Sequence, residues 1–381
     1  MEKAAIIGVG MTRIEAQKPT ETFADMAWEA VNRALTDAGM TIGDIDNIIT
    51  TSNDFWDGRT ISCMAVGDAS GAYGKNISCV EGDGTFGAFY GLARILSGAY
   101  GTTLVTAHSK GSESVSSLIT NAAFDPIYDR ALGMDMITAA ALQATAYMHR
   151  TGTTSEQLAA VSVKNHGNAR ANPMAQLPMD IGVADVLASE MIADPLHKLD
   201  CSPVSDGCCA LIIASEDRAT QYQAPPVWIR GAAFCADAYY LGDRDLSRAP
   251  ALTTAARKAF AMAGIDDPSR DISLAEVYDA FTYQELLWLE AMGLCGDGQA
   301  GRLTMAGRFN PDGVLPVNPS GGLLSGHPVI AAGLIRLAEA ALQIRGDAGA
   351  HQVPGVHTAL AHGVNGLCGQ SHCVWVLGDS R

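Results

Sequence analysis

The two halves of this chain of 381 residues are expected to hold the same elements in the same order. Each half has an apolar strand, a helix that ends at a glycine, an acidic turn and a second strand. The first half has a strand over 4–9, a helix over 22–38 ending at Gly39 and a strand ending near Thr51. The second half has a strand over 227–230, a helix over 252–263 ending at Gly264 and a strand over 272–277. This repeated order indicates an internal duplication, which restricts the fold to two similar halves.

The repeat continues beyond these segments. A helix over 82–97 and a strand over 103–107 in the first half match a helix over 328–342 and a strand over 357–361 in the second. Strands that alternate with helices in two similar halves predict an α/β protein. We expect a pair of mostly parallel sheets with buried helices between them.

A polar stretch that contains proline, residues 221–226, predicts the boundary between the halves. The N-terminal half is therefore expected over 1–225 and the C-terminal half over 226–381. Residues from about 114 to 195 carry helices of their own, such as one over 134–150. This segment is predicted to be a loop domain inserted on top of the first half.

The charge of the chain limits its binding partners. A formal net charge of −16 argues against a nucleic-acid surface, because phosphate backbones are bound by clustered Lys and Arg. No run of about 18 apolar residues occurs, and the chain enters a strand directly at Lys3 without a signal peptide. We expect a cytoplasmic protein that contacts neither nucleic acid nor membrane.

Nine cysteines are scattered among apolar neighbours. Their odd number and irregular spacing match neither a secreted disulfide framework nor a paired zinc motif. Most are expected to be buried free thiols, and no metal site is predicted.

A glycine-rich turn near the C-terminus holds a constrained histidine. His327 lies between Gly326 and Pro328, just before an apolar helical run. Glycine and proline fix the backbone, so the ring is held where a ligand can reach it. An incidental loop histidine is the alternative.

A second such turn precedes the helix over 82–97. Backbone N–H groups and the positive end of the helix dipole gather at a helix N-terminus, where they stabilise a thiolate. Cys79 is the candidate nucleophile there, although Glu81 and Asp83 oppose a thiolate through their own charge. A buried core thiol is the alternative for Cys79.

Two further residues are candidates for the same site. His362 follows a strand in the second half as His327 follows its turn, and two histidines at one cleft can serve as a general base and an oxyanion donor beside a thioester carbonyl. Tyr278 follows the strand over 272–277, where it can donate a hydrogen bond or relay a proton. Capping a strand end is the alternative for His362, and simple packing is the alternative for Tyr278.

These residues resemble those of the thiolase superfamily, in particular its sterol-carrier-protein-type and archaeal thiolases. The matching stretches are 5–12, 205–207, 276–282, 318–322, 326–328 and 359–362. The resemblance implies a five-layered α/β/α/β/α thiolase fold, a homodimer and acyl-CoA substrates. It also implies coenzyme A as a substrate or product, and chemistry without a metal or an organic cofactor.

The resemblance assigns roles to individual residues. His327 corresponds to the histidine that activates the nucleophile, and His362 to a second acid/base position. Tyr278 replaces the usual histidine or asparagine of an oxyanion hole. Contacts with coenzyme A are assigned to Ser320, Gly321 and Gly322.

The nucleophile position can be aligned in two ways. Counting back without gaps from Ser97 and Gly98 places Glu81 there, whereas matching the pattern Cys-x-x-Gly selects Cys79. A cysteine would carry an acyl group as a thioester. With a glutamate, the chain resembles thiolase-like aldolases that cleave 3-hydroxyacyl-CoA, although those tend to lose the glycine–histidine–proline element that is present here.

Three functions are compatible with these residues. The first is a thiolase-type acyl-CoA C-acyltransferase, which cleaves a 3-oxoacyl-CoA with coenzyme A or runs the reverse Claisen condensation on acyl groups that include bulky ones such as benzoylsuccinyl-CoA. The second is a cofactor-free retro-aldol lyase on a 3-hydroxyacyl-CoA. The third is a non-catalytic subunit that binds acyl-CoA. The resemblance also implies a small partner subunit with a zinc ribbon and an OB fold.

Overall fold

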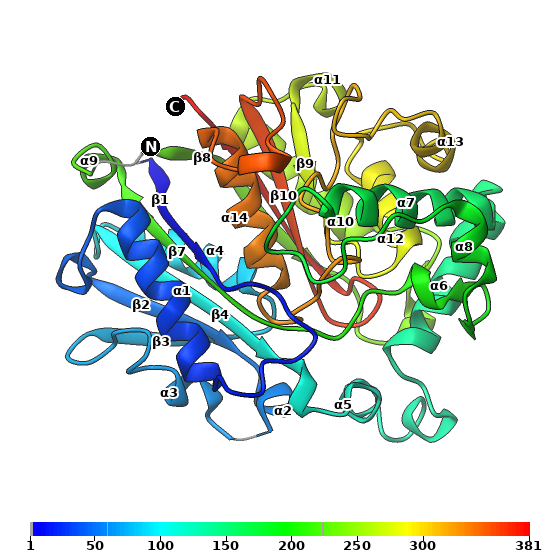
Figure 1. Cartoon of the computed structure of the whole chain (residues 1–381), viewed down its shortest axis with the longest axis horizontal. Coiled ribbons are helices and arrows are strands. Elements are labelled where there is room, and N and C mark those ends of the chain that lie inside the picture. Colours follow the sequence, from blue (N-terminus) through cyan, green and yellow to red (C-terminus); the bar gives the residue numbers. More distant parts are fainter. Residues whose placement is uncertain (1–2, 59, 223–224) are drawn as a thin grey trace.

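A computed structural model describes residues 3–58, 60–222 and 225–381, and most of its strands form one nine-stranded sheet (Figure 1). The strands are β1 (Ala4–Met11), β2 (Asn47–Ser52), β3 (Asn76–Glu81), β4 (Thr102–Lys110), β5 (Met191–Ala193), β6 (Leu196–His197), β7 (Asp206–Ser215), β8 (Val227–Ala236), β9 (Leu274–Glu276), β10 (Thr358–Asn365) and β11 (Ser371–Gly378). The helices are α1 (Phe23–Ala38), α2 (Asp54–Asp57), α3 (Ser62–Ala65), α4 (Gly84–Leu96), α5 (Ser116–Ala122), α6 (Met136–Thr151), α7 (Ser155–Ala169), α8 (Val183–Ala188), α9 (Glu216–Ala219), α10 (Pro250–Ala263), α11 (Pro268–Asp271), α12 (Thr282–Ala291), α13 (Ala300–Met305) and α14 (Ala332–Arg345).

The strand order repeats between the two halves, as the duplicated pattern predicts. The first half contributes β3-β2-β4-β7-β1 and the second contributes β9-β10-β11-β8. A parallel bridge from Ala275 to Val317 stands beside β9 where the first half has β3. Residues 223 and 224, within the predicted boundary at 221–226, lie outside the described residues.

The expectation of two mostly parallel sheets is wrong in two respects. Parallel pairing is found between β2 and β3, β2 and β4, and β9 and β10, whereas the other pairs of the large sheet are antiparallel. One reason is that a short turn joins β10 directly to β11, and such a hairpin forces antiparallel pairing. The halves also join, because Ala5 and Ile6 of β1 pair with Trp228 and Val227 of β8.

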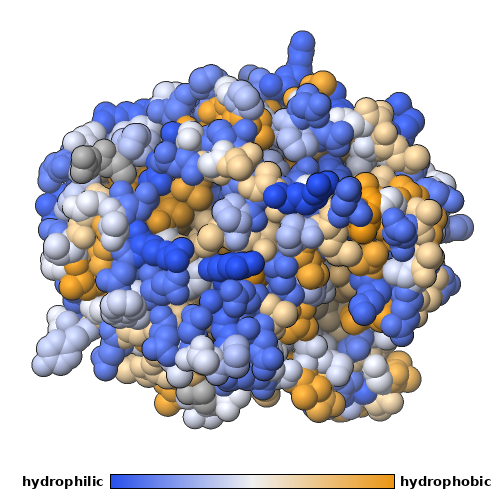
Figure 2. Space-filling view, in the orientation of Figure 1, coloured by the Kyte–Doolittle hydropathy of each residue, from blue (hydrophilic) through white to orange (hydrophobic). Residues whose placement is uncertain are grey.

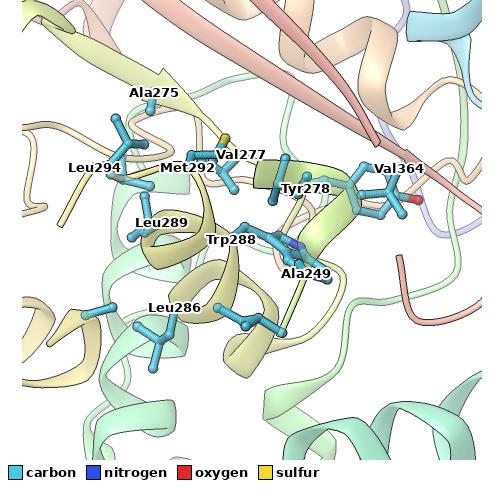
Figure 3. Packing of buried hydrophobic residues seen from close by; sticks show 14 of the residues in the cluster. Ala249, Ala275, Val277, Tyr278, Leu286, Trp288, Leu289, Met292, Leu294 and Val364 are labelled. Atoms are coloured by element: carbon cyan, nitrogen blue, oxygen red, sulfur yellow. The ribbon is translucent and has the colours of Figure 1, made fainter. Parts of the chain in front are cut away.

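The helices form layers on both sides of these strands. Helix α1 packs on β1, β4 and β7, and α10 packs on β8 and β11, whereas α4 and α14 contact each other and strands of both halves. The order is therefore α1, first-half strands, the pair α4 and α14, second-half strands, and α10, which is a five-layered arrangement. Apolar side chains fill the spaces between the layers, and Figure 3 shows part of the cluster around α12, including Leu286, Trp288 and Leu289.

Two glycines let the outer helices approach their strands closely. A Cβ atom on Gly10 of β1 would collide with the backbone of α1 at Ala30, and one on Gly231 of β8 would collide with the backbone of α10 at Ala259. The two contacts occupy equivalent places in the halves. Any larger residue must push the helix away from the sheet.

The segment between β4 and β7 holds four helices, α5 to α8, and the short hairpin of β5 and β6. The helix expected over 134–150 is α6, and α7 packs against α12 and α13 of the second half. The segment therefore contacts both halves, and its definition as a separate loop domain over about 114–195 stays a prediction.

Hydrophilic side chains predominate on the face of the molecule shown in Figure 2, with apolar patches scattered among them. Among the described residues, no helix combines the length and the apolar composition that a membrane span requires.

Gly10→Ala and Gly231→Ala are each expected to lower the free energy of unfolding by about 1–3 kcal/mol, because the added methyl group overpacks the helix–strand contact. Urea denaturation followed by circular dichroism measures the change.

Gly167→Ala is the matched control, because Gly167 lies inside α7 with open space around a Cβ atom. It should raise the free energy of unfolding by about 0.5–1 kcal/mol. Unchanged stability in both sheet variants would contradict the proposed close packing.

Candidate active site

Turns from both halves of the chain enclose a cavity of about 310 Å³. The β3–α4 turn, the β9–α12 turn and the β10–β11 turn form its walls, together with α2, α5, α6 and the segment before α14. The lining residues are Asn53, Phe55, Trp56, Glu81, Gly82, Asp83, Ile119, Thr120, Ala122, Ala123, Met136, Ala140, Tyr278, Ala280, Phe281, Gln284, Val329, Ile330, Val364, Asn365, Gly366, Leu367, Cys368 and Gly369. Most of these side chains are apolar, so the few polar groups define where chemistry can occur.

Tyr278 and His327 form a hydrogen-bonded pair at this cavity. The Tyr278 hydroxyl lies 2.9 Å from Nε2 of His327, and the Ser202 hydroxyl lies 2.8 Å from Nδ1 of the same ring. Tyr278 lines the cavity and His327 lies behind it, 4% exposed. Burial lowers the pKa of His327 to about 3 and raises the pKa of Tyr278 well above its ordinary value, so both groups are neutral near pH 7.

The sequence around this pair explains its position. The His327 backbone N–H donates to the Ser205 hydroxyl at 2.8 Å, and a Cβ atom on Gly326 would lie 2.8 Å from the Ile14 side chain. Asn318 has a φ of 51°, and its side chain accepts from the Val277 N–H at 2.7 Å. These contacts hold the turn before His327 and the strand end before Tyr278 in fixed positions relative to each other.

Neither of the two predicted histidines lines the cavity. His362 lies within β10, fully buried, with Nε2 3.0 Å from Nδ1 of His372, and its ring packs against Trp288. Val364 lies two residues further along the same strand and does line the cavity. Side chains two residues apart on a strand share a face, so His362 and Val364 lie on the same face of β10, about 7 Å apart along the strand. The convergence of His362 with His327 on one cleft stays a prediction.

The end of β3 separates the two candidate nucleophiles. Glu81 lines the cavity, and its Oε1 accepts from the Asn53 side chain at 2.9 Å. Cys79 is exposed on the same edge strand, with Sγ 3.5 Å from the Ser52 hydroxyl, and it does not line the cavity. The structure thus brings Glu81, not Cys79, to the site.

The residues predicted to contact coenzyme A are buried beneath the cavity. The Ser320 hydroxyl donates to Oε2 of Glu276 at 2.8 Å, and the backbone at Gly321 and Gly322 has positive φ angles of 99° and 63°. There is no room for a Cβ atom at Gly322 beside the carboxylate of Asp279, whose pKa burial raises to about 7. None of the three predicted residues lines the cavity, and their contact with coenzyme A stays a prediction.

Asp83 is a site residue whose position the sequence did not assign. It caps the N-terminus of α4, accepting from the Thr85 N–H at 2.9 Å, and its other oxygen accepts from the Gly333 N–H at 2.7 Å. Burial raises the pKa of Asp83 to about 6. An Asp followed two residues later by Thr at a helix start is the signal that could have identified this cap.

Three more lining residues with polar groups were also missed. Asn365 lies close to Gly82, where a Cβ atom would be 2.6 Å from the Asn365 amide nitrogen. Gln284 and Cys368 lie on other parts of the cavity wall. Burial raises the pKa of the Cys368 thiol to about 12, which keeps it protonated. No local pattern in the sequence distinguishes these three residues from neighbours that face the core.

The described residues hold no group of three or more His, Cys, Asp or Glu side chains arranged to bind a metal ion.

Comparisons with known proteins show chains that are similar in sequence and in fold. A family model described as "Thiolase C-terminal domain-like" matches residues 233–379. The acetyl-CoA acetyltransferase of Methanothermobacter thermautotrophicus is 36% identical over 97% of this chain and 98% of its own. The benzoylsuccinyl-CoA thiolase subunit BbsB of Thauera aromatica is 32% identical over 60% of each chain. A solved structure described as the Ltp2-ChsH2(DUF35) aldolase has a TM-score of 0.84 and 28% identity, covering 99% of this chain and 97% of that one.

The burial of His327 generates a pH-dependent stability. Its pKa is 6.5 in the absence of burial and about 3 in the folded chain, so only the unfolded state binds a proton between these values. The stabilising contribution is complete above pH 6.5 and is lost as the pH falls toward 3, by about 1.4 kcal/mol per pH unit. In His327→Gln this contribution is absent, so the stability difference between wild type and variant should shrink from pH 6 to pH 4.

Urea denaturation at a series of pH values measures this difference. His149→Gln, at an exposed histidine outside the cavity, is the matched substitution. Parallel stability curves for wild type and His327→Gln would contradict the burial of a neutral imidazole.

Proposed function

Because this chain belongs to the thiolase family, we propose that it is a thiolase-type acyl-CoA C-acyltransferase, which makes or breaks a carbon–carbon bond next to a thioester carbonyl. In the cleavage direction, the thiol of coenzyme A attacks a 3-oxoacyl-CoA and two acyl-CoA products leave. In the reverse direction, two acyl groups are joined by a Claisen condensation. The support is the full-length likeness to an acetyl-CoA acetyltransferase at 36% identity.

The Tyr278–His327 pair is the observation that carries this proposal. Cleavage of the bond between C2 and C3 leaves an enolate on the thioester, and condensation begins with the same enolate. A neutral Tyr278 can donate its hydroxyl hydrogen to the oxygen that gains negative charge, in a cavity whose apolar walls strengthen this hydrogen bond. His327 holds the hydroxyl at 2.9 Å and can replace or accept its proton.

The route of the acyl group depends on the nucleophile. A covalent thioester on Cys79 requires the Cys79 thiol to reach a cavity that it does not line. In a direct route, the sulfur of coenzyme A bonds to C3, the C2–C3 bond breaks, and the proton of the coenzyme A thiol ends on C2. Both routes consume one coenzyme A for each cleavage and give the same two products.

Glu81 favours a second candidate, a retro-aldol lyase on a 3-hydroxyacyl-CoA. The 3-hydroxyl group would pass its proton through Tyr278 to His327, the C2–C3 bond would break, and C3 would leave as an aldehyde or ketone. The electron pair would form the thioester enolate, which takes a proton at C2, so no coenzyme A is consumed. A carboxylate at the end of β3 and the likeness to a structure described as an aldolase support this candidate.

Turnover of 3-oxoacyl-CoA by the purified chain is expected to require free coenzyme A and to consume it one for one. Chromatography of the acyl-CoA products measures this stoichiometry. Tyr278→Phe should lower kcat/KM by about 100-fold or more, because the hydrogen-bond donor to the developing oxyanion is lost. Tyr73→Phe, at a side chain 92% exposed, is the matched control.

Two outcomes would overturn the acyltransferase. Release of an aldehyde or ketone from a 3-hydroxyacyl-CoA without consumption of coenzyme A would replace it by the lyase. Absence of turnover with either substrate class would leave a non-catalytic acyl-CoA-binding subunit. Mass spectrometry after incubation with 3-oxoacyl-CoA then distinguishes the two acyl-transfer routes, because an acyl adduct on Cys79 forms only in the covalent one.

We also propose that the chain works in the cytoplasm as a homodimer with a small second subunit carrying a zinc ribbon and an OB fold. One relative is described as a subunit of a thiolase, and the aldolase structure is described under a double name, Ltp2-ChsH2(DUF35). Affinity purification of the tagged chain from its native host should recover the small subunit in equal amount. Full activity of the chain expressed alone would argue that this subunit is dispensable.

A further inference from the structure

Gln284 is a buried amide on the wall of the cavity. It is the third residue of α12, its side chain is 4% exposed, and it lines the cavity on the same side as Phe281. Its Oε1 atom has no hydrogen-bond partner among the described residues. A buried carbonyl oxygen without a partner is costly, so a native structure that keeps one at a ligand cavity needs an explanation.

A chain of hydrogen bonds sets the orientation of the Gln284 amide. The carbonyl oxygen of Cys368 can only accept, so Gln143 must turn its Nε2 toward it, at 3.2 Å. Oε1 of Gln143 is then free to accept from the Tyr283 hydroxyl at 2.8 Å, and Tyr283 in turn accepts from Nε2 of Gln284 at 3.4 Å. Burial raises the pKa of Tyr283 well above its ordinary value, so this hydroxyl keeps its proton.

The Cys368 carbonyl group, at which this series of hydrogen bonds starts, is itself held in place. Arg244 donates to the carbonyl oxygens of Leu367 and Cys368 and so holds the β10–β11 turn. Gln143 and Tyr283 are both buried, at 1% and 0% exposed, so solvent does not reach them to reverse the donors and acceptors of these hydrogen bonds. The amide of Gln284 therefore cannot exchange its two ends without breaking a hydrogen bond, and Oε1 remains the free acceptor.

The cavity wall also carries the carboxylates of Glu81 and Asp83, but these already accept hydrogen bonds from Asn53, Thr85 and Gly333, whereas Oε1 of Gln284 has no partner among the described residues. The remaining walls of the cavity are largely apolar, with Trp56, Ile119, Met136, Phe281, Ile330 and Leu367 among them. A volume of about 310 Å³ is at the lower end of the range for pockets that bind drug-sized molecules, so a two-carbon acyl group would leave most of it unfilled. The cavity suits a bulky apolar group that carries one hydrogen-bond donor.

We propose that Gln284 is a specificity residue, which selects acyl-CoA substrates whose bulky acyl group carries a hydroxyl that donates to Oε1. The inference rests on the proposed action on acyl-CoA and adds the class of acyl group. A site built to pair one hydroxyl discriminates strongly against the analogue that lacks it, because the buried acceptor is then left unpaired.

Binding measurements test this without any turnover. The probes are 3-phenylpropionyl-CoA and its 2-, 3- and 4-hydroxyphenyl derivatives, which have neither a 3-oxo nor a 3-hydroxy group on the acyl chain and so are not cleaved between C2 and C3. By isothermal titration calorimetry, at least one hydroxylated probe should bind the wild type about 10-fold more tightly than the parent. In Gln284→Leu this preference should vanish while the affinity for the parent probe is unchanged.

Tyr283→Phe provides a second variant that leaves the cavity wall in place. Removing the hydroxyl frees the Gln284 amide to turn, so the preference for the hydroxylated probe should fall. The double variant with Tyr283→Phe and Gln284→Leu should show the same preference as Gln284→Leu alone. Gln221→Leu, at an exposed glutamine, is the matched control and should keep the wild-type preference.

Three results would overturn the inference. The first is equal affinity of the wild type for all four probes. The second is a preference for the hydroxylated probe that survives in Gln284→Leu. The third is an equal loss of affinity for the parent and hydroxylated probes in Gln284→Leu, which would assign the donor to the pantetheine amides. Failure of every probe to bind, the parent included, would instead contradict the action on acyl-CoA on which the inference rests.

Discussion

One buried carboxylate joins the two halves of the molecule where the cavity forms. Asp83 caps α4 and also accepts the Gly333 N–H in the first turn of α14, so a single side chain connects the N-termini of the two central helices. A Cβ atom at Gly333 or Gly363 would intrude on this carboxylate. The turn after β3, the segment before α14 and the end of β10 are therefore held together, and these three pieces supply much of the cavity wall. Because burial keeps the pKa of Asp83 near 6, the connection itself is sensitive to proton concentration.

The cavity combines a neutral hydrogen-bonded pair with two carboxylates on its wall, Glu81 and Asp83, and with further buried carboxylates that do not line it. Tyr278 and His327 are both uncharged near pH 7, so before reaction the pair adds no unpaired ion to an apolar space. Below them, Asp279 is held by the Leu323 N–H at 2.6 Å and by the Asn165 amide at 2.7 Å. These buried contacts hold the β9–α12 turn and the glycine-rich turn against each other, which fixes the distance between the two reactive side chains.

The two candidates for the nucleophile position, Cys79 and Glu81, lie on one strand. Residues 79 and 81 lie on the same face of β3, two positions apart, and only the second reaches the cavity. The likeness to an acetyl-CoA acetyltransferase extends over nearly the whole chain, and the proposed carbon–carbon bond chemistry assigns the reactive role to the Tyr278–His327 pair. In the proposed acyl transfer Tyr278 donates a hydrogen bond to the oxygen that gains charge, and in the proposed retro-aldol reaction it relays the proton of the 3-hydroxyl group. Consumption of coenzyme A separates the two reactions.

The sequence alone was enough for the duplication and most element positions, because these depend on local periodicity and on turns such as those at Gly39 and Gly264 that follow from backbone sterics. The family came from the resemblance of short motifs to those of thiolases. The sequence also singled out His327 and Tyr278, which the structure joins by a hydrogen bond, since a histidine between glycine and proline and a tyrosine after a strand are local signals. Strand direction, the burial of His362 and the position of Glu81, rather than Cys79, on the cavity wall depended on register and on which turns meet across the halves. Those are non-local contacts, and a shift of one or two residues along a strand changes which side chain reaches the cavity.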